Sequence, residues 1–240
     1  MARTLRFLFV TGAVAVAALG GAAHAFACGS DGYTYAGLVA PKQAFGISAS
    51  ITSVDDFAVL HGHVAGWVGV GGPGEGPGSA DEWLQIGLSG FPGVTGSDLY
   101  YEVVRPGLQP VYHQVASSLP VGTSVNVAVL EMHDHPDWWR VSLNGRAVSR
   151  PIRLPGSRDR WTPMATAESW DGGTGASCNS LLYRFRHIQL AHAPGGAWHS
   201  LSSGYPIKSP TTRIRRARGG AGFLAAEGRR AFRLLASLSP

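Results

Sequence analysis

The 240-residue sequence is poor in cysteine and has no long apolar run after its first 25 residues. Nothing beyond that point is long and apolar enough to span a bilayer, so we expect no membrane span. No glycine-rich phosphate loop opens a helix, and the sequence has no Gly-x-Ser-x-Gly elbow or catalytic-cysteine context. These absences argue against a P-loop nucleotide-binding protein and against a serine or cysteine hydrolase.

The N-terminus has the three-part layout of a secretory signal peptide. Arg3 and Arg6 precede an apolar run rich in Ala, Val and Leu, and the small-residue pattern Ala23-His24-Ala25 follows it. We therefore predict a signal peptide over residues 1–25 and a secreted, extracellular protein. A transmembrane anchor is the alternative, but the run is short and lacks charged flanks on both sides.

The two cysteines, Cys28 and Cys178, lie far apart in the sequence. In an oxidising compartment such a pair is best interpreted as one disulfide that ties the N-terminus to a late loop. Two free thiols are the alternative. A metal site built on two distant cysteines alone is disfavoured.

The net charge of +5 is unevenly distributed. Residues 207–240 hold eight basic side chains and one acidic one, whereas residues 26–206 carry a net charge of −4. The positive charge therefore gives no reason to expect that the folded domain binds nucleic acid. We predict a basic flexible tail over residues 202–240 that contacts anionic cell-surface polymers, with a short amphipathic helix near residues 223–236 as the alternative.

Between these ends, apolar residues recur with period two. In AFGISASIT (residues 44–52), Phe45, Ile47, Ala49 and Ile51 share one face, and turn-rich stretches separate similar segments. The pair Asn144-Gly145 suits a tight hairpin turn. About ten short strands without a helical stripe predict an all-β domain over residues 26–201, a two-sheet antiparallel sandwich of the concanavalin/lectin-like jelly-roll type.

Three of these strands carry a polar or aromatic face opposite an apolar or small-residue one. Within EWLQIGLSG, Leu84, Ile86 and Leu88 point to the core, while Trp83, Gln85, Gly87 and Ser89 point the other way. A face that combines an aromatic, an amide and a glycine suits the floor of a groove, where the glycine leaves room for a ligand. Alternation likewise groups Asp98, Tyr100 and Glu102 in one strand, and Met164, Thr166, Glu168 and Trp170 in another.

Four segments, read in order, resemble the eqolisins, the glutamic peptidases. They are WVGVGG (67–72), LQIG (84–87), SDLYYE (97–102) and AESW (167–170), and TYAG (34–37) precedes them. The family pattern has W-V-G-I-D-G, L-Q-T-G, Y-D-A-W-Y-E and a later strand that ends in the catalytic glutamate. Gly71 and Ile86 stand where that pattern has Asp and Thr.

The resemblance, which covers residues 33–192, implies an acid endopeptidase that acts on polypeptides and needs no cofactor. Gln85 and Glu168 would be the catalytic pair: Glu168 would activate a water and later protonate the leaving amine, and Gln85 would stabilise the oxyanion. Six further residues would surround this pair as candidates for substrate binding: Trp67, Trp83, Asp98, Tyr100, Glu102 and Trp170.

Two other functions compete with this hypothesis. A non-catalytic binding module with the same fold would use the aromatic groove to hold a glycan or an extended peptide. A metal site would draw on His61 and His63, which share a strand face, or on His133 and His135. No third element supplies ligands at suitable spacing, so we predict no metal.

Overall fold

The computed structural model describes residues 32–158, 161–175, 179–218 and 222–240. Almost all of its regular structure is β-strand. The strands are β1 (Tyr33–Val39), β2 (Gly46–Ser53), β3 (His63–Gly72), β4 (Glu82–Gly90), β5 (Ser97–Val104), β6 (Val111–Leu119), β7 (Ser124–Glu131), β8 (Trp138–Leu143), β9 (Arg146–Ala147), β10 (Ile152–Arg153), β11 (Met164–Trp170), β12 (Leu181–Ala193), β13 (Gly196–Ser200), β14 (Tyr205–Lys208), β15 (Thr212–Arg216) and β16 (Gly222–Glu227). A 3-10 turn, η2 (Pro77–Ser79), precedes β4, and helix α1 (Arg229–Ser237) follows β16.

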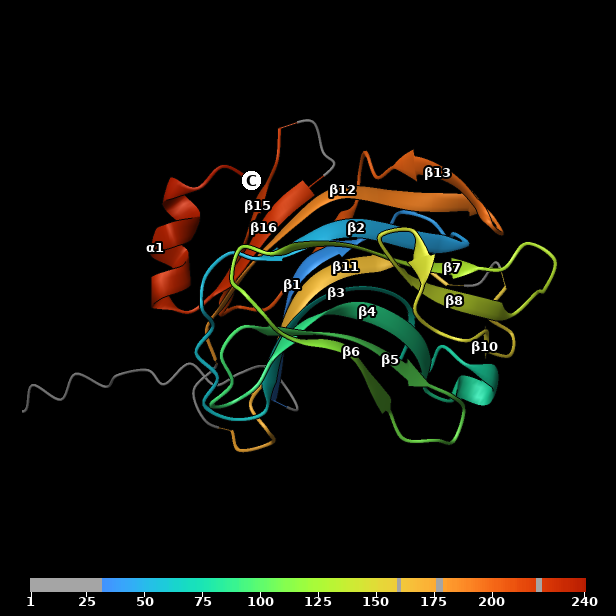
Figure 1. The fold of residues 1–240 in the computed structure, drawn as a ribbon, viewed down its shortest axis with the longest axis horizontal. Helices are drawn as coiled ribbons and strands as arrows, with labels where there is room; N and C mark the ends of the chain where they lie inside the picture. The colour runs from blue at the N-terminus through green and yellow to red at the C-terminus, as the bar shows by residue number, and fades with distance from the viewer. Residues whose placement is uncertain (1–31, 159–160, 176–178, 219–221) are drawn as a thin grey trace, which may run out of the picture.

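The strands form two curved antiparallel sheets that lie one over the other (Figure 1). The seven-stranded sheet has the order β14-β1-β11-β3-β4-β5-β6. The nine-stranded sheet has the order β10-β8-β7-β2-β12-β16-β15, with β13 beside β12 and β9 beside β8. This architecture confirms the predicted all-β, jelly-roll sandwich. Within the described ranges, no helix is long and apolar enough to cross a membrane.

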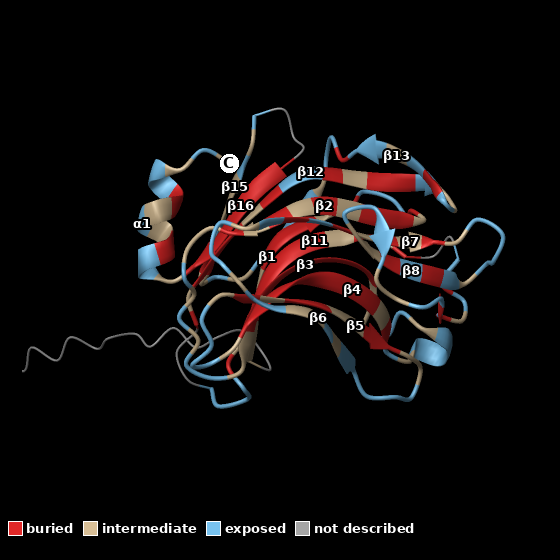
Figure 2. Ribbon diagram, viewed as in Figure 1, coloured by how far each residue is buried: buried red, intermediate tan, exposed pale blue. Residues whose placement is uncertain are grey.

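The core lies between the two sheets, where the strands are buried (Figure 2). Leu84, Ile86 and Leu88 point into it from β4, as their alternation predicts, and each is at most 1% exposed. The rings of Phe185 and Phe223 stack there with centroids 4.5 Å apart. Burying such side chains contributes about 1.5–3 kcal/mol each, which makes this interlayer the main source of stability. It also leaves the opposite face of β4 free for a site.

The predicted Asn144-Gly145 turn is confirmed. Both residues have positive φ angles, 50° and 76°, and Leu143 pairs with Arg146 across the turn. A two-residue hairpin loop needs this left-handed backbone, which Asn and Gly adopt at the lowest cost.

The prediction of a flexible tail is wrong, because β14, β15 and β16 belong to the two sheets of the sandwich. β16 lies between β12 and β15 in the nine-stranded sheet, and β14 extends the seven-stranded sheet beside β1. Helix α1 packs Ala231 and Leu235 onto the outer face of the nine-stranded sheet. The alternative of a helix over residues 223–236 is only partly right. The helix begins at Arg229, and residues 223–227 belong to strand β16.

Arginines of this segment and of β12 contact the C-terminal helix and the residues that follow it. The guanidinium of Arg213 lies 5.1 Å from the ring centroid of Phe232. Arg215 donates to the carbonyl of Ala236, and Arg184 of β12 donates to that of Ser239. Positive groups at a helix C-terminus satisfy its free carbonyls and oppose its dipole. The arginines whose number suggested a disordered tail therefore stabilise the packing of helix α1.

Among the buried carboxyl groups of the described residues, Glu82 and Glu227 have a raised pKa. Glu227 on β16 accepts hydrogen bonds from Thr34 (2.8 Å) and Thr211 (2.9 Å), and burial raises its pKa despite these bonds. Glu82, at the start of β4, is fully buried, and neither of its oxygens has a hydrogen-bond partner among the described residues. Burial, reinforced by the charge of Asp137 and opposed by Arg105, raises the pKa of Glu82 to about 7.

We predict that the protein is more stable in acid than at neutral pH. The folded chain holds the Glu82 proton more tightly than the unfolded chain, whose corresponding pKa is 4.5. The stability from this group is therefore fully present below pH 4.5 and is lost as the pH rises through about 7. The expected slope is at most about 1.4 kcal/mol per pH unit. Urea unfolding at several pH values measures it.

In the Glu82→Gln variant this slope should decrease, because the carboxyl no longer titrates. Glu75→Gln, at an exposed position in the preceding loop, is the matched control and should keep the wild-type slope. Equal slopes for wild type and Glu82→Gln would contradict the prediction.

Candidate functional site

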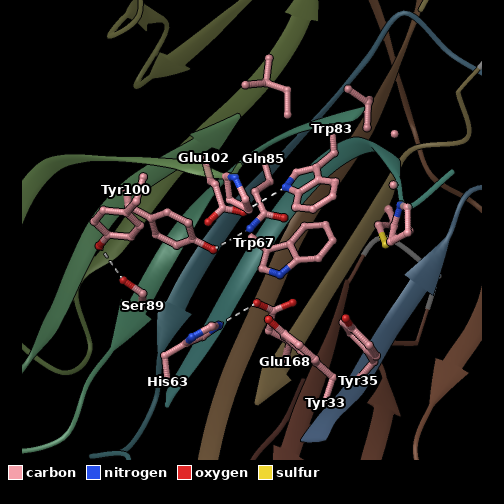
Figure 3. Close-up of a pocket in the computed structure, with 18 of the residues that line it drawn as sticks. Tyr33, Tyr35, His63, Trp67, Trp83, Gln85, Ser89, Tyr100, Glu102 and Glu168 are labelled. Atoms are coloured by element: carbon pink, nitrogen blue, oxygen red, sulfur yellow. Dashed lines mark hydrogen bonds and ion pairs between the residues drawn. The ribbon is translucent and has the colours of Figure 1, made fainter. Parts of the chain in front are cut away.

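The outer face of the seven-stranded sheet carries a cavity of about 920 Å³ (Figure 3). All seven strands contribute to its lining, which is mainly aromatic and apolar. The lining residues are Tyr33, Tyr35, His63, Trp67, Val70, Gly71, Gly72, Pro73, Trp83, Leu84, Gln85, Ser89, Phe91, Tyr100, Glu102, Pro110, Tyr112, Met164, Glu168 and Ile207. A second cavity of about 220 Å³ shares Gly71–Pro73 and Met164 with the first and extends the groove to Glu75 and Thr162.

Gln85 lies at the middle of β4, where it pairs with Gly69 on β3 and Glu102 on β5. Its side chain points away from the core, is 7% exposed, and donates from Nε2 to the hydroxyl of Tyr100 at 3.1 Å. The Tyr100 ring stacks on Tyr112 at 4.9 Å. Burial, with the negative charge of nearby glutamates, raises the pKa of Tyr100 well above its usual range. Gln85 is therefore held by a neutral phenol in a packed wall.

Glu168 lies at the middle of β11, between Tyr35 on β1 and Ala65 on β3. It faces the same cavity as Gln85, and β3 is the one strand between their two strands. In Figure 3 the indole of Trp67 lies between the two side chains. Glu168 is 8% exposed, and its Oε1 lies 3.1 Å from Nε2 of His63. The sheet thus directs the side-chain amide of Gln85 and the carboxyl group of Glu168 into the same cavity.

Gly87 makes room for Trp67 rather than for a ligand. A Cβ atom at Gly87 would lie 2.1 Å from the carbonyl oxygen of Gly66 and 2.7 Å from Cβ of Trp67. Trp67 is 7% exposed and packs with Ala65 and Tyr100 in a small cluster apart from the main core. This corrects the expectation that Gly87 leaves space for substrate, since its missing side chain lets the tryptophan lie across the sheet.

We predict that Gly87→Ala destabilises the protein by about 1–3 kcal/mol, because overpacking against a backbone carbonyl forces the strands apart. Urea denaturation measures the change. Gly72→Ala is the control: its new Cβ would lie 3.6 Å from Glu75, an ordinary contact. If both variants unfold at the wild-type urea concentration, this account of Gly87 is incorrect.

Further acidic and phenolic groups line the cavity. Glu102 accepts a hydrogen bond from Nε1 of Trp83 at 3.0 Å. Burial raises the pKa of Glu102 and the Trp83 bond opposes that change, so it keeps its proton to higher pH than a solvated glutamate. Burial and the charge of Glu168 raise the pKa of Tyr33 to about 12. The tyrosine hydroxyls near Glu168 therefore remain hydrogen-bond donors at ordinary pH.

No family model and no curated protein matches this chain. Among solved structures, the chain is similar to scytalido-glutamic peptidase in complex with a transition-state analog inhibitor, with 15% identity, a TM-score of 0.53, and coverage of 82% of this chain and 98% of that one. It is also similar to SCP-B, a member of the eqolisin family in complex with the tripeptide Ala-Ile-His, with 15% identity, a TM-score of 0.50 and the same coverage. The chain has the eqolisin fold.

The eqolisin fold brings together most of the residues that the sequence predicted for the site. Six of the eight line the cavity: Gln85, Glu168, Trp67, Trp83, Tyr100 and Glu102. Asp98 and Trp170 do not line it. Asp98 accepts hydrogen bonds from Gln114 (3.0 Å) and from the backbone of Ser118 (3.2 Å), and so ties the edge strand β6 to β5. Trp170 stacks on Tyr33 with ring centroids 5.8 Å apart.

The two departures from the eqolisin pattern have different structural contexts. Ile86 is fully buried in the core, so the exchange of Thr for Ile does not alter the groove. Gly71 has φ of 80°, and a Cβ there would lie 2.3 Å from the carbonyl oxygen of Glu82. An aspartate at this position would be strained. Gly71 itself lines both cavities.

Sequence reasoning missed several lining residues, among them Tyr33, Tyr35, Phe91 and Tyr112. A signal for the first two was present, because Tyr33 and Tyr35 alternate along one strand and share a face. His63 was considered only as a metal ligand, whereas it contacts Glu168.

No cluster of three metal-ligating side chains occurs in the part of the chain that the structure describes. Cys28 and Cys178 lie outside the described residues.

Proposed function

We propose that the protein is an exported endopeptidase that hydrolyses peptide bonds with Gln85 and Glu168. The observation that carries this proposal is that an amide and a carboxylate, two strands apart, face one aromatic cavity in an eqolisin fold. Export rests on the N-terminal sequence pattern, as does the Cys28–Cys178 disulfide.

The two carboxyl oxygens of Glu168 have the hydrogen-bonding pattern that a general base requires. One oxygen, Oε1, contacts His63, and Oε2 makes no hydrogen bond with the described residues. Oε2 would take a proton from water as the water oxygen bonds to the peptide carbon. The same proton would then pass to the amine nitrogen as the C–N bond breaks, which returns Glu168 to its starting state.

Gln85 would stabilise the oxyanion that forms in the first step. A primary amide has two N–H donors, and only one of them is used in the bond to Tyr100. The second would donate to the carbonyl oxygen as it gains negative charge. Since Tyr100 fixes the amide beforehand, little reorganisation is required during the reaction.

The shape of the groove suits a polypeptide. Residues of β3 and β11 line both of the adjoining cavities, which would offer apolar and aromatic surface to side chains on either side of the cleaved bond. We infer that the substrate is an extended or unfolded chain, because a compact protein would not place its backbone at the sheet floor.

The proposal is tested by incubating the purified protein with a denatured protein at pH 3–5 and identifying the fragments by mass spectrometry. We expect internal cleavage of the denatured protein and no binding to immobilised glycans. The opposite result, retained glycan binding with no new peptide termini, would support a non-catalytic module and overturn the proposal.

A further inference from the structure

His63 is the only basic side chain that lines the cavity, as far as the described residues show. It opens β3, and the register places it opposite Trp170 while Ala65, two residues later, is opposite Glu168. This diagonal neighbour relation brings Nε2 of His63 to 3.1 Å from Oε1 of Glu168 (Figure 3). The two side chains are 23% and 9% exposed, so the contact is largely shielded from water.

Three aromatic rings fix the orientation of the imidazole. The centroids of Trp170, Phe91 and Tyr33 lie 5.6, 6.2 and 6.4 Å from that of His63. Tyr33 also stacks on Tyr35, which extends the rigid surface along β1. With these neighbours the ring has little freedom to turn, and its Nε2 edge stays directed at the carboxylate.

The charged and titratable groups around His63 come from three strands. Glu168 faces it from β11, Tyr33 from β1, and Glu102 from β5, where the positive charge of His63 opposes the rise in the pKa of Glu102. All are acidic or phenolic, so a protonated His63 supplies the positive charge that this end of the groove otherwise lacks.

We infer that His63 is a positioning residue for Glu168, an inference that rests on the proposed peptidase function. Its Nε2–H donates to Oε1 and holds the carboxyl group so that Oε2 points to the water. His63 keeps its proton throughout: the proton removed from water goes to Oε2 and then to the amine. The Gln85–Glu168 pair implied by the eqolisin resemblance does not include this histidine.

Steady-state kinetics on a fluorogenic peptide test the inference. His63→Ala should lower kcat by about 10- to 100-fold with KM changed by less than about threefold, because the carboxylate is misplaced but the groove is intact. His63→Gln should recover most of kcat, since its side-chain amide can donate to the same oxygen. His61→Ala, at an exposed position two residues earlier, is the matched control and should behave as wild type.

A wild-type kcat in His63→Ala, beside an inactive Glu168→Gln variant, would overturn the inference and leave the peptidase proposal standing. Absence of hydrolysis by the wild type would instead overturn the peptidase proposal. The contact itself is tested without turnover by ¹⁵N NMR of the histidines. The His63 ring signals should change in Glu168→Ala while those of His61 stay the same, and unchanged His63 signals would show that the contact does not exist.

Discussion

Under the proposed peptidase function, we expect that replacing Glu168 with Gln lowers kcat/KM for peptide hydrolysis by about 10³-fold or more. The substitution keeps the size of the side chain and its place on β11, but an amide cannot accept the proton of water or return it to the amine. General acid–base catalysis is commonly worth about 10²–10⁴-fold. Steady-state kinetics with a fluorogenic peptide at acid pH measure the loss, and circular dichroism checks that the variant is folded.

The same assay on Gln85→Ala should show a loss of about 10²–10³-fold, the usual effect of removing one oxyanion donor. Because both residues act on one intermediate, the double variant should be little worse than Glu168→Gln alone. Fully multiplicative losses would mean that the two side chains act at separate steps. Activity that survives both substitutions would rule out this mechanism.

We expect Phe223→Ala to destabilise the protein by about 3–5 kcal/mol, although Phe223 lies in a segment whose composition resembles a disordered tail. Phe223 is fully buried on β16, and its ring stacks on Phe185 between the sheets. Removing the ring leaves a cavity in the core. Urea or thermal unfolding measures the effect. Deletion of residues 222–240 should prevent folding altogether, because β12 and β15 would lose the strand that lies between them.

Tyr205→Ala is the matched control for Phe223→Ala. Tyr205 is another aromatic residue of the C-terminal segment, but it is 66% exposed, so its removal should change stability by less than about 0.5 kcal/mol. A truncated protein that remains folded with the wild-type melting temperature would show that the segment is dispensable, and would contradict the placement of β16 in the sheet.

The sandwich could be predicted because period two is a local signal. Each turn of Asn-Gly type and each alternation such as Leu84, Ile86 and Leu88 reflects backbone geometry within a few residues. The same alternation assigned Gln85 and Glu168 to groove-facing positions without any knowledge of strand order. Only the resemblance paired them across β3, since sheet order depends on long-range contacts that local patterns do not record.

The C-terminal segment was misread because its strand is short and its flanks are basic. The sequence GFLAAE (222–227) has one aromatic and two alanines, with little alternation, so its place in the sheet depends on pairing with β12 and β15. Arginines were counted as solvated charges, yet Arg213 and Arg215 bind the helix that follows. Tertiary packing here overrides composition, which is a weak predictor of order for short segments.

The errors within the site have a similar origin. Asp98 and Trp170 do not line the cavity, although their cross-strand partners Ser89 and His63 do. Asp98 instead bonds Gln114 on β6, and Trp170 stacks on Tyr33. His63 was missed because its partner is 105 residues away in sequence. Strand alternation assigns a face, whereas the length of a groove along that face depends on loops and on large residues such as Phe91.

A crystal structure of the Glu168→Gln variant with an uncleaved peptide tests the central claim most directly. Our account predicts that the peptide lies in the groove along β3 and β11, with one backbone carbonyl oxygen within hydrogen-bond distance of Nε2 of Gln85. The side chain at position 168 should face the carbon of that carbonyl, directly or through one water. A peptide bound elsewhere, or one that leaves either side chain out of reach, would contradict the account.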